Sequence, residues 1–215
     1  MVWVIIPCQY IDSSGWINES KRRKNTMGFI ANLRKAKEKI LCKIKLQKNH
    51  VKVGKNVSFR GVPLIYTPNG SLTIGNDTRI NSGIMYNAIG GNQETSFVTK
   101  GNGSIVIGKN VGVSNTAFVA QTNITVEDDV LIGGGCCIYD TDFHSIKYEK
   151  RMDRKNPGTL TKPVKIKKGA FIGAHSIILK GVEIGEYAIV GAGSVVTKSM
   201  GADMGWKPRE VYKIC

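Results

Sequence analysis

A six-residue period near the C-terminal end constrains the fold of this chain more than any other feature. Every sixth residue over this stretch is aliphatic: Ile166, Ile172, Ile178, Ile184, Val190 and Val196. The residue four places after each of the first five is small or β-branched. An α-helix needs apolar residues three and four apart, and a half-buried strand needs simple alternation. The period therefore predicts short strands and tight turns stacked around one axis, as in a β-solenoid.

The same phase can be followed through most of the chain. It is carried by Val53, Phe59, Ile65, Ile74, Ile80 and Tyr86, and later by Ile107, Val113, Val119, Val126, Ile132 and Ile138. A one-residue slip near Thr122 predicts a small bulge. Residues 87–104 are irregular and rich in glycine, which predicts projecting loops or degenerate coils. We expect the repeat to occupy residues 51–200, followed by a basic tail over residues 201–215.

The segment before the repeat has a different composition. Residues 1–26 are polar and carry four consecutive cations at 21–24, with no aromatic residues interleaved. They predict a poorly ordered arm, and we expect no nucleic-acid partner. Residues 27–50 predict a basic amphipathic helix capped by Thr26, with seven lysines and arginines. This helix packs on the base of the solenoid or lies on an anionic membrane, and the two interpretations are compatible.

Charge and cysteine content limit the partners and the compartment. The formal net charge of +15 favours anionic partners. The five cysteines have no disulfide-like spacing, and the adjacent pair Cys136 and Cys137 lies inside the repeat, as expected for a reduced intracellular protein. No apolar run approaches the ~20 residues of a spanning helix. We therefore expect a cytoplasmic protein, with peripheral contact at the inner face of the membrane.

The repeat is interrupted by a loop over residues 139–163. A loop of this length inside a compact repeat is uncommon unless it is functional. It contains His144, one of three histidines, two residues after Asp142 and four after Asp140. Neutral imidazole is a natural general base for a hydroxyl or amine nucleophile. In an extended segment residues two apart point the same way, so we predict that His144 is the base and that Asp142 orients it.

Three stretches carry a family resemblance in their order. They are Tyr139-Asp140-Thr141-Asp142-Phe143-His144, residues 163–175, and Gly191-Ala192-Gly193-Ser194-Val195-Val196-Thr197-Lys198. The chain resembles the hexapeptide-repeat acyltransferases, and within them the maltose and galactoside acetyltransferases and the polysaccharide O-acetyltransferases. The similarity covers residues 105–214 well and 53–104 loosely. It implies an all-β solenoid: a left-handed parallel β-helix with an N-terminal α-helix and an extruded catalytic loop. The handedness comes only from the resemblance, because parallel crossovers are otherwise right-handed.

The resemblance also implies where the substrates bind. The family's catalytic histidine matches His144. Its acetyl-CoA lies in a groove between subunits, which implies a homotrimer. The groove positions match Phe171, Ala174, Ala192, Thr197 and Lys198, with Lys213 or Arg209 in the tail at the nucleotide end. For the acceptor, Asn115 is the nearest match to an asparagine of some relatives, and Asp140 is a second candidate ligand.

These observations predict transfer of an acetyl group from acetyl-CoA to a hydroxyl of a sugar or polysaccharide precursor, such as a lipid-linked glycan. The alternatives are an N-acetyltransferase for an amino sugar, an antibiotic acetyltransferase, and a non-catalytic basic scaffold. We expect no metal, because a three-histidine zinc site needs convergent ligands and His50 precedes the repeat. A nucleophilic role for Cys136 is disfavoured because its slot in the repeat predicts burial. We interpret His175 as a packed or subunit-interface residue.

Overall fold

The computed structural model of the protein describes the backbone of residues 13–207 and 210–213, and side chains from residue 30 to residue 205. The expectations for residues 1–12 and for Arg209 lie outside the described residues. The chain divides into two compact units, residues 1–37 and residues 38–215. The second unit holds the solenoid and the end of the helix that leads into it.

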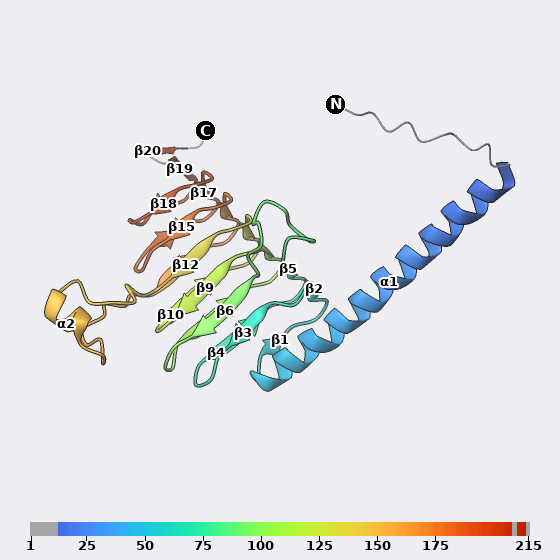
Figure 1. Ribbon diagram of the computed structural model, residues 1–215. Helices are drawn as coiled ribbons and strands as arrows, with labels where there is room; N and C mark the ends of the chain where they lie inside the picture. Colours follow the sequence, from blue (N-terminus) through green and yellow to red (C-terminus); the bar gives the residue numbers. More distant parts are fainter. Residues whose placement is uncertain (1–12, 208–209, 214–215) are drawn as a thin grey trace, which may run out of the picture. The chain divides into compact units, whose positions relative to one another are not determined.

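Three sheets of stacked parallel strands form the solenoid (Figure 1). Sheet A contains β1 (Lys52–Val53), β4 (Ser71–Ile74), β7 (Ser104–Ile107), β10 (Asn123–Val126), β13 (Val164–Ile166) and β16 (Glu183–Ile184). Sheet B contains β2 (Ser58–Arg60), β5 (Arg79–Asn81), β8 (Gly112–Ser114), β11 (Leu131–Ile132), β14 (Phe171–Ile172), β17 (Ile189–Val190), β19 (Met204–Lys207) and β20 (Glu210–Lys213). Sheet C contains β3 (Leu64–Tyr66), β6 (Ser96–Thr99), β9 (Ala117–Ala120), β12 (Cys137–Tyr139), β15 (Ile177–Ile178) and β18 (Val195–Val196).

The chain visits sheets A, B and C in turn, so each coil contributes one strand to each sheet. Ile166 pairs with Ile184, and Ile172 pairs with Val190, which means that three hexapeptides make one coil. The only antiparallel pairing of named strands in the described chain joins β19 to β20. The architecture is a left-handed parallel β-helix with an N-terminal helix, as predicted from the repeat and the family resemblance.

The core consists of the side chains that point inward from the three sheets. Ile166, Ile172 and Ile178 are each fully buried, as the six-residue phase predicts. The prediction is wrong at Val119, which is only half-buried. Its neighbour Phe118 is fully buried and stacks on Phe97 with ring centroids 5.1 Å apart.

The register change has a local cause at the corner that follows β8. Val113 and Phe118 both point inward, and the corner between them is one residue shorter than the equivalent corner between Ile132 and Ile138. The next corner, between Phe118 and Val126, contains Thr122 and is two residues longer than the equivalent corner between Ile178 and Ile184. The net slip of one residue is the sum of the two changes, so the predicted slip near Thr122 is present and the shorter corner near Asn115 was not predicted. The following strands β9 and β10 pair regularly with their neighbours on both sides.

Corners of the solenoid repeatedly use residues in the left-handed backbone region. Between sheets A and B these include Asn56, Asp77, Asn110 and Asp129, and between sheets B and C they include Asn115, Gly135, His175 and Gly193. Asn, Asp and Gly adopt this conformation at low cost. His175 has φ +59° and an exposed side chain. It is therefore not packed within its own chain, contrary to one of its two expected placements.

Helix α1 (Ser13–Lys48) begins well before the expected start at Met27. The polar segment predicted to be an irregular arm is helical from Ser13, in keeping with the good helix propensity of lysine and arginine. The helix ends in a Schellman motif: His50 has φ +50° and the Val51 amide donates to the Leu46 carbonyl over 3.0 Å. Leu46 and Val51 pack against the solenoid core, so the end of the helix caps its base.

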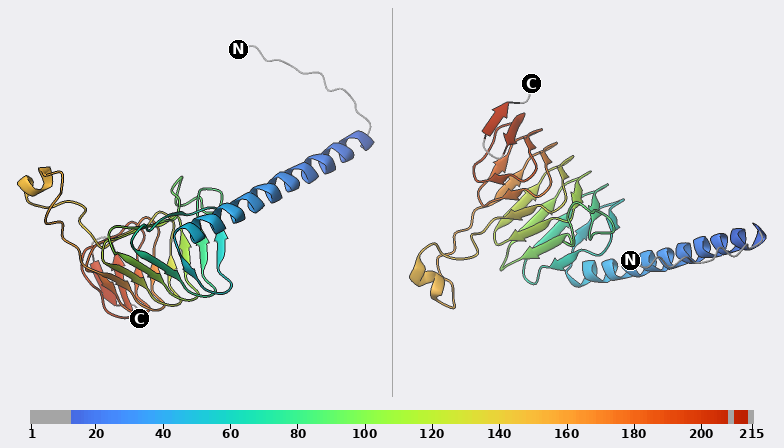
Figure 2. Two further views of the ribbon diagram at one scale, coloured as in Figure 1. Left: turned by 90° about the horizontal axis from the view of Figure 1, so that it is seen from below. Right: turned by 45° about the horizontal axis from the view of Figure 1, so that its top comes forward.

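Two insertions leave the regular coils (Figure 2). One covers residues 82–95 between β5 and β6 and includes Tyr86, which the six-residue phase had placed on a strand. The other runs from Asp140 to Pro163, stands away from the solenoid and contains the short helix α2 (Tyr148–Met152). The second insertion is the loop that the interrupted repeat predicts.

Candidate functional site

The candidate site is built from the two corners that flank sheet C. The loop leaves the solenoid at the corner between sheets C and A, which we call the loop corner. Ala174 and Ala192 lie at the corner between sheets B and C, which we call the alanine corner. Each corner repeats in every coil, so side chains at equivalent positions form ladders along the solenoid.

His144 is exposed at the root of the loop. Its amide donates to the Asp142 carbonyl over 2.7 Å, and the residue between them, Phe143, has φ +62°. This is a γ-turn, a strained conformation for a bulky residue. The Phe143 ring lies edge-on to Tyr139 with centroids 5.2 Å apart, and the Phe143 carbonyl accepts a bond from Asn156. These contacts hold the turn while the imidazole itself bonds to no other described side chain.

Asp142 does not bond to His144, although the sequence predicted that it would orient the ring. Its carboxylate forms an ion pair with Lys180 on the next coil, at 2.9 Å. The two arms of the loop also pair at their base: the Asp142 amide donates to Leu160, and Thr141 bridges Thr161. Asp142 therefore fixes the root of the loop to the solenoid, and any effect on His144 passes through the backbone.

Asp140 is fully buried and its two carboxylate oxygens are occupied. One accepts from the Gln121 amide over 2.7 Å, and the other accepts from the amide and hydroxyl of Thr122 over 2.7 and 2.8 Å. These bonds close the turn in the coil below. A carboxylate used in this way has no exposed oxygen for a substrate, so we do not include Asp140 among the proposed acceptor ligands.

Asn115 has a similar structural role at the alanine corner, where it is fully buried. Its side-chain oxygen accepts from the Gly83 amide over 2.9 Å, and its side-chain nitrogen donates to the Asn87 carbonyl over 2.8 Å. Both partners belong to the insertion over residues 82–95. Asn115 therefore anchors that insertion, and we do not include it in the proposed acceptor site either.

The residues predicted to contact the donor fall into two groups. Phe171, Ala174 and Ala192 lie on sheet B and the adjoining alanine corner, where the Gly193 amide donates to the Ala174 carbonyl over 2.8 Å. Thr197 and Lys198 are exposed at the loop corner, on the opposite side of sheet C. Lys213 lies on β20 opposite Met204, and its side chain is outside the described residues.

The cysteine near the site does not have the character of a nucleophile. Cys136 is fully buried, and burial raises the pKa of its thiol to about 11. Its sulfur donates to the Gly173 carbonyl over 3.2 Å. Thiolate is the reactive form, so a thiol with this pKa is almost entirely unreactive at neutral pH. This agrees with the interpretation of Cys136 as a core residue.

A ladder of lysines at the loop corner was not predicted from the sequence. Lys162, Lys180 and Lys198 occupy equivalent positions in three successive coils. The Gly181 amide donates to the Lys162 carbonyl over 2.9 Å, which brings two members of the ladder together. The signal was present in the sequence as a spacing of three hexapeptides. It predicts a positive edge beside the loop, suitable for an anionic substrate.

A hollow of about 480 Å³ opens between the loop and the loop corner, lined in part by Lys100, Gln121, Asn156 and Thr159. Among the side chains that the structure describes, no three His, Cys, Asp or Glu residues are grouped closely enough to hold a metal ion.

Comparison with known proteins identifies the type of repeat. Residues 163–198 match the family model of the bacterial transferase hexapeptide, with six repeats. The chain carries the bacterial transferase hexapeptide repeat. No curated protein sequence matches the chain. The expected resemblance to hexapeptide-repeat acyltransferases is confirmed by this match together with the solved structures that share the fold.

Two of the similar structures are of AntD, an N-acyltransferase from Bacillus cereus. A mutant in complex with dTDP and coenzyme A is 27% identical with a TM-score of 0.58, over 79% of this chain and 87% of that chain. AntD in complex with dTDP and 3-hydroxybutyryl-CoA is 27% identical with a TM-score of 0.57, over 80% of this chain and 86% of that chain.

A hexapeptide-repeat-containing acetyltransferase from Vibrio cholerae shares the fold alone. It is 22% identical, with a TM-score of 0.50, over 83% of this chain and 90% of that chain. No helix in the described part of this hexapeptide-repeat protein is long and apolar enough to cross a membrane.

Proposed function

We propose that this protein transfers an acetyl group from acetyl-CoA to a hydroxyl group of a sugar or polysaccharide precursor, with His144 as general base. The observation that carries the proposal is the position of His144: an exposed imidazole at the root of the interrupting loop of a hexapeptide β-helix. Acyl transfer from coenzyme A is supported by the AntD complexes, which hold coenzyme A or an acyl-CoA on the same fold.

The proposed reaction needs no covalent enzyme intermediate. The His144 imidazole takes the proton from the acceptor hydroxyl, and the oxygen attacks the thioester carbonyl of acetyl-CoA. The tetrahedral intermediate collapses to the acetyl ester and the thiolate of coenzyme A, which receives the proton from His144. A backbone amide stabilises the oxyanion during this step. Lys198 is exposed, and its ammonium group would bind the phosphates of coenzyme A.

The second candidate is acetylation of an amino group on a nucleotide-linked sugar. It is favoured by the AntD relatives, because AntD is an N-acyltransferase whose structures hold dTDP. An amine that is already neutral attacks a thioester without a strong base. The two candidates therefore differ in how much they depend on His144. An antibiotic amine and a non-catalytic scaffold remain as the further alternatives.

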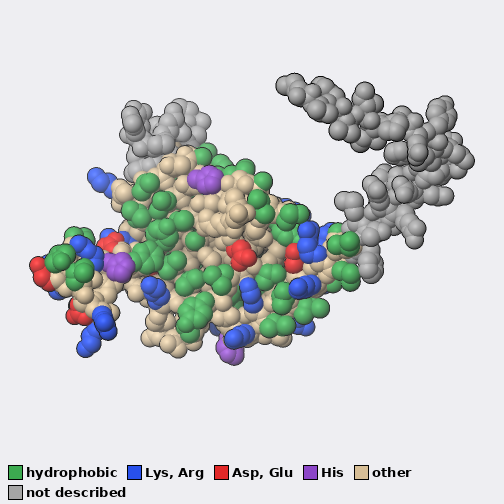
Figure 3. All heavy atoms as spheres, in the orientation of Figure 1, with side chains coloured by type: hydrophobic (Ala, Val, Ile, Leu, Met, Phe, Trp, Pro, Cys, Tyr) green, Lys and Arg blue, Asp and Glu red, His purple; other side chains and the backbone are tan. Residues whose placement is uncertain are grey.

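Assembly as a homotrimer is part of the proposal. In one chain His144 and Ala174 lie on opposite sides of sheet C. The base and the groove can therefore form one site if the base of one subunit faces the groove of a neighbouring subunit. The outward positions of sheet C carry no charge: Leu64, Tyr66, Ser96, Val98, Ala117, Val119, Cys137, Tyr139, Ile177 and Val195. Hydrophobic side chains gather on the solenoid face seen in Figure 3. An uncharged apolar face of this kind is typical of a subunit contact.

Helix α1 supports the proposed peripheral membrane contact. Five apolar side chains of the helix are exposed on one side, Ile30, Leu33, Ile40, Leu41 and Ile44, and Lys37 lies among them. The seven lysines and arginines between residues 30 and 48 suit an anionic lipid surface, where each contributes about 1 kcal/mol. Sedimentation with phosphatidylserine vesicles should exceed that with phosphatidylcholine vesicles, and Ile40→Glu should abolish the difference. Equal sedimentation of the wild type with both lipids would remove the membrane from the proposal.

The function itself is tested by release of coenzyme A from acetyl-CoA against a panel of acceptors. The panel pairs each hydroxyl sugar with its amino counterpart, both free and nucleotide-linked. Turnover that requires a hydroxyl acceptor supports O-acetylation, and turnover that requires an amine supports the second candidate. Purified protein that neither binds acetyl-CoA nor releases coenzyme A with any member of the panel would refute both.

A further inference from the structure

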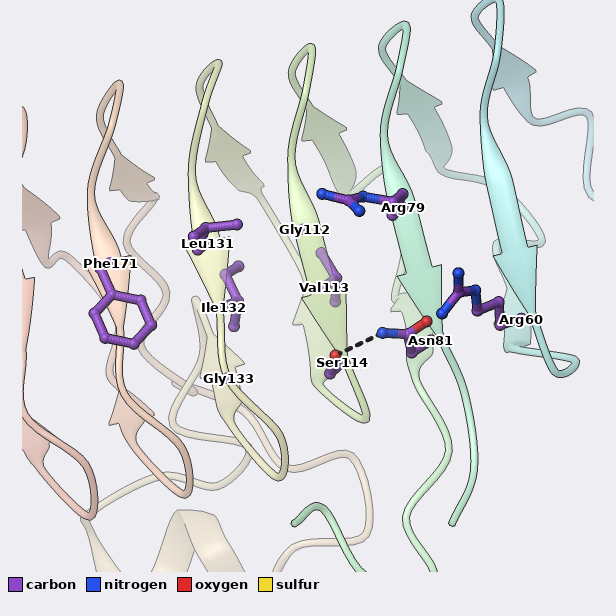
Figure 4. Close-up of a pocket in the computed structure, with 10 residues that line it drawn as sticks. All are labelled: Arg60, Arg79, Asn81, Gly112, Val113, Ser114, Leu131, Ile132, Gly133 and Phe171. Carbon is purple, nitrogen blue, oxygen red and sulfur yellow. Dashed lines mark hydrogen bonds between the residues drawn. The ribbon is translucent and has the colours of Figure 1, made fainter. Parts of the chain in front are cut away.

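The outer face of sheet B contains a hollow that shares only Phe171 with the predicted donor site. Its volume is about 240 Å³, and we call it the sheet B notch (Figure 4). The floor is Gly112 on β8, which pairs with Arg79 on β5 and with Leu131 on β11. Glycine leaves a gap in the row of outward side chains. A Cβ atom at residue 112 would lie 2.8 Å from the nearest Leu131 carbon.

The two rows of side chains across the notch differ in character. One row runs Arg79, Gly112, Leu131 and Phe171, from a cation across the gap to an aliphatic and an aromatic side chain. The other row is polar: Arg60 pairs with Asn81, and the Asn81 amide donates to the Ser114 hydroxyl over 3.0 Å. In Figure 4 the Arg79 guanidinium extends toward Gly112, and that of Arg60 lies beside Asn81. The notch therefore has a cationic end and an apolar end.

The cationic end has no acidic side chain to neutralise it. Arg60 and Arg79 are both exposed, and neither forms an ion pair within the side chains that the structure describes. None of the outward positions on the strands of sheet B from β2 to β17 is acidic. The nearest carboxylate along the chain is Asp77, at the corner beside β5, and its oxygen accepts a bond from Asn56. Two uncompensated guanidinium groups on neighbouring strands attract an anion strongly.

The spacing indicates what kind of anion fits. Diagonal neighbours on paired strands have Cβ atoms roughly 7 Å apart, so the long side chains of Arg60 and Arg79 can converge on one diphosphate. From Arg79 to Phe171 there are three strand-to-strand steps of ~4.8 Å. A planar group attached to the diphosphate would therefore reach the apolar end and contact the Phe171 ring or Leu131. A bare phosphate would leave that end unused.

We propose that the sheet B notch binds the diphosphate of a nucleotide on Arg60 and Arg79, with the base over Leu131 and Phe171. The inference deepens the proposed function and rests on it: the nucleotide is a carrier of one of the two substrates. Two substrates have this chemistry, a nucleoside-diphosphate sugar and coenzyme A. The arginines lie on the first coils, whereas Ala192 and Lys198 lie on the last ones, which favours the acceptor as the source.

Binding of dTDP, UDP and coenzyme A to the full-length protein, measured by calorimetry, tests the inference. Arg60→Gln and Arg79→Gln should each lower the affinity for the nucleotide that binds in the notch by about tenfold, and the double variant should lower it further. Lys109→Gln, which removes a cation at a corner outside the notch, should leave every affinity unchanged. Loss of affinity for dTDP or UDP assigns the notch to the acceptor, and loss for coenzyme A assigns it to the donor.

Unchanged affinity for all three nucleotides in the double variant, with its melting temperature also unchanged, would overturn the inference. The inference would also be overturned if the arginine substitutions lowered the affinity for thymidine as much as that for dTDP, because the arginines would then not contact phosphate. Turnover of acetyl-CoA by the wild type separates this failure from failure of the proposed function. A wild type that transfers acetyl groups while the arginine variants bind normally contradicts the notch alone.

Discussion

The carboxylate of Asp142 lies 2.9 Å from the ammonium group of Lys180, and both side chains are about a quarter exposed, at 27% and 28%. The pair joins the root of the loop to the next coil of the solenoid. The second carboxylate oxygen of Asp142 is buried and has no hydrogen-bond partner among the described residues. The lysine is therefore the main compensation for this charge, and the backbone turn that presents His144 starts from an anchored residue.

We expect Lys180→Met to destabilise the protein more than Asp142→Asn. Loss of the lysine leaves a partly buried carboxylate without its counter-charge, at a cost of about 1–3 kcal/mol. In the asparagine variant the long lysine side chain can instead reorient so that its ammonium group is solvated. Chemical denaturation measures both, and the double variant should reveal a coupling energy of about 1 kcal/mol. Lys198→Met, one coil further on, serves as the control for stability. Equal stability of Lys180→Met and wild type would contradict an anchoring role.

His144→Ala should lower kcat by a factor of roughly 10²–10⁴, the usual contribution of a positioned acid–base group. The KM for acetyl-CoA should barely change, since the predicted donor contacts lie on regular coils. Stability should hold because the exposed imidazole buries little apolar area. His50→Asn, which removes an imidazole at the left-handed end of helix α1, is the matched control. A His144→Ala enzyme with more than about half the wild-type kcat at saturating acceptor would refute the proposed base.

A shared site predicts that two inactive variants complement each other. His144→Ala removes the base, and Ala174→Trp blocks the groove at the alanine corner. If the base of one subunit serves the groove of another, equal mixing after reversible dissociation should restore about a quarter of the wild-type activity, because that fraction of interfaces joins an intact base to an intact groove. Light scattering should give a trimer. Mixtures with no more activity than either variant would place the whole site in one chain.

Stability should fall in alkaline solution because of buried thiols. Burial raises the pKa of Cys136 from 9.0 to about 11, so the folded protein retains a proton that the unfolded chain releases above pH 9. Stability from this group is complete below pH 9 and is lost as the pH rises toward 11, by about 3 kcal/mol in total. Thermal melts of wild type and Cys136→Ala between pH 8 and 11 measure the difference. A parallel pH dependence in the two proteins would show that Cys136 makes no such contribution.

The architecture followed from the sequence because the solenoid is specified locally. Each inward residue, such as Ile172 or Val190, packs against its equivalents in neighbouring coils, and its burial depends on a phase that repeats every six residues. The interrupting loop was visible for the same reason, as the place where the phase stops. The replacement of Val119 by Phe118 as the inward residue was not visible from the period. A corner that is one residue shorter turns the side chains of β9 to the opposite face, and the longer corner before β10 restores the phase.

The candidate site divides in the same way. The sequence alone determined that His144 lies in the loop, and that the repeat belongs with the hexapeptide transferases. Only the tertiary structure decided that Asp142 pairs with Lys180, that Asp140 closes a turn, and that Arg60 and Arg79 share a notch. Those contacts join residues from different coils or from the two arms of the loop. Their distances depend on how the coils stack and where the loop returns, which no local pattern encodes.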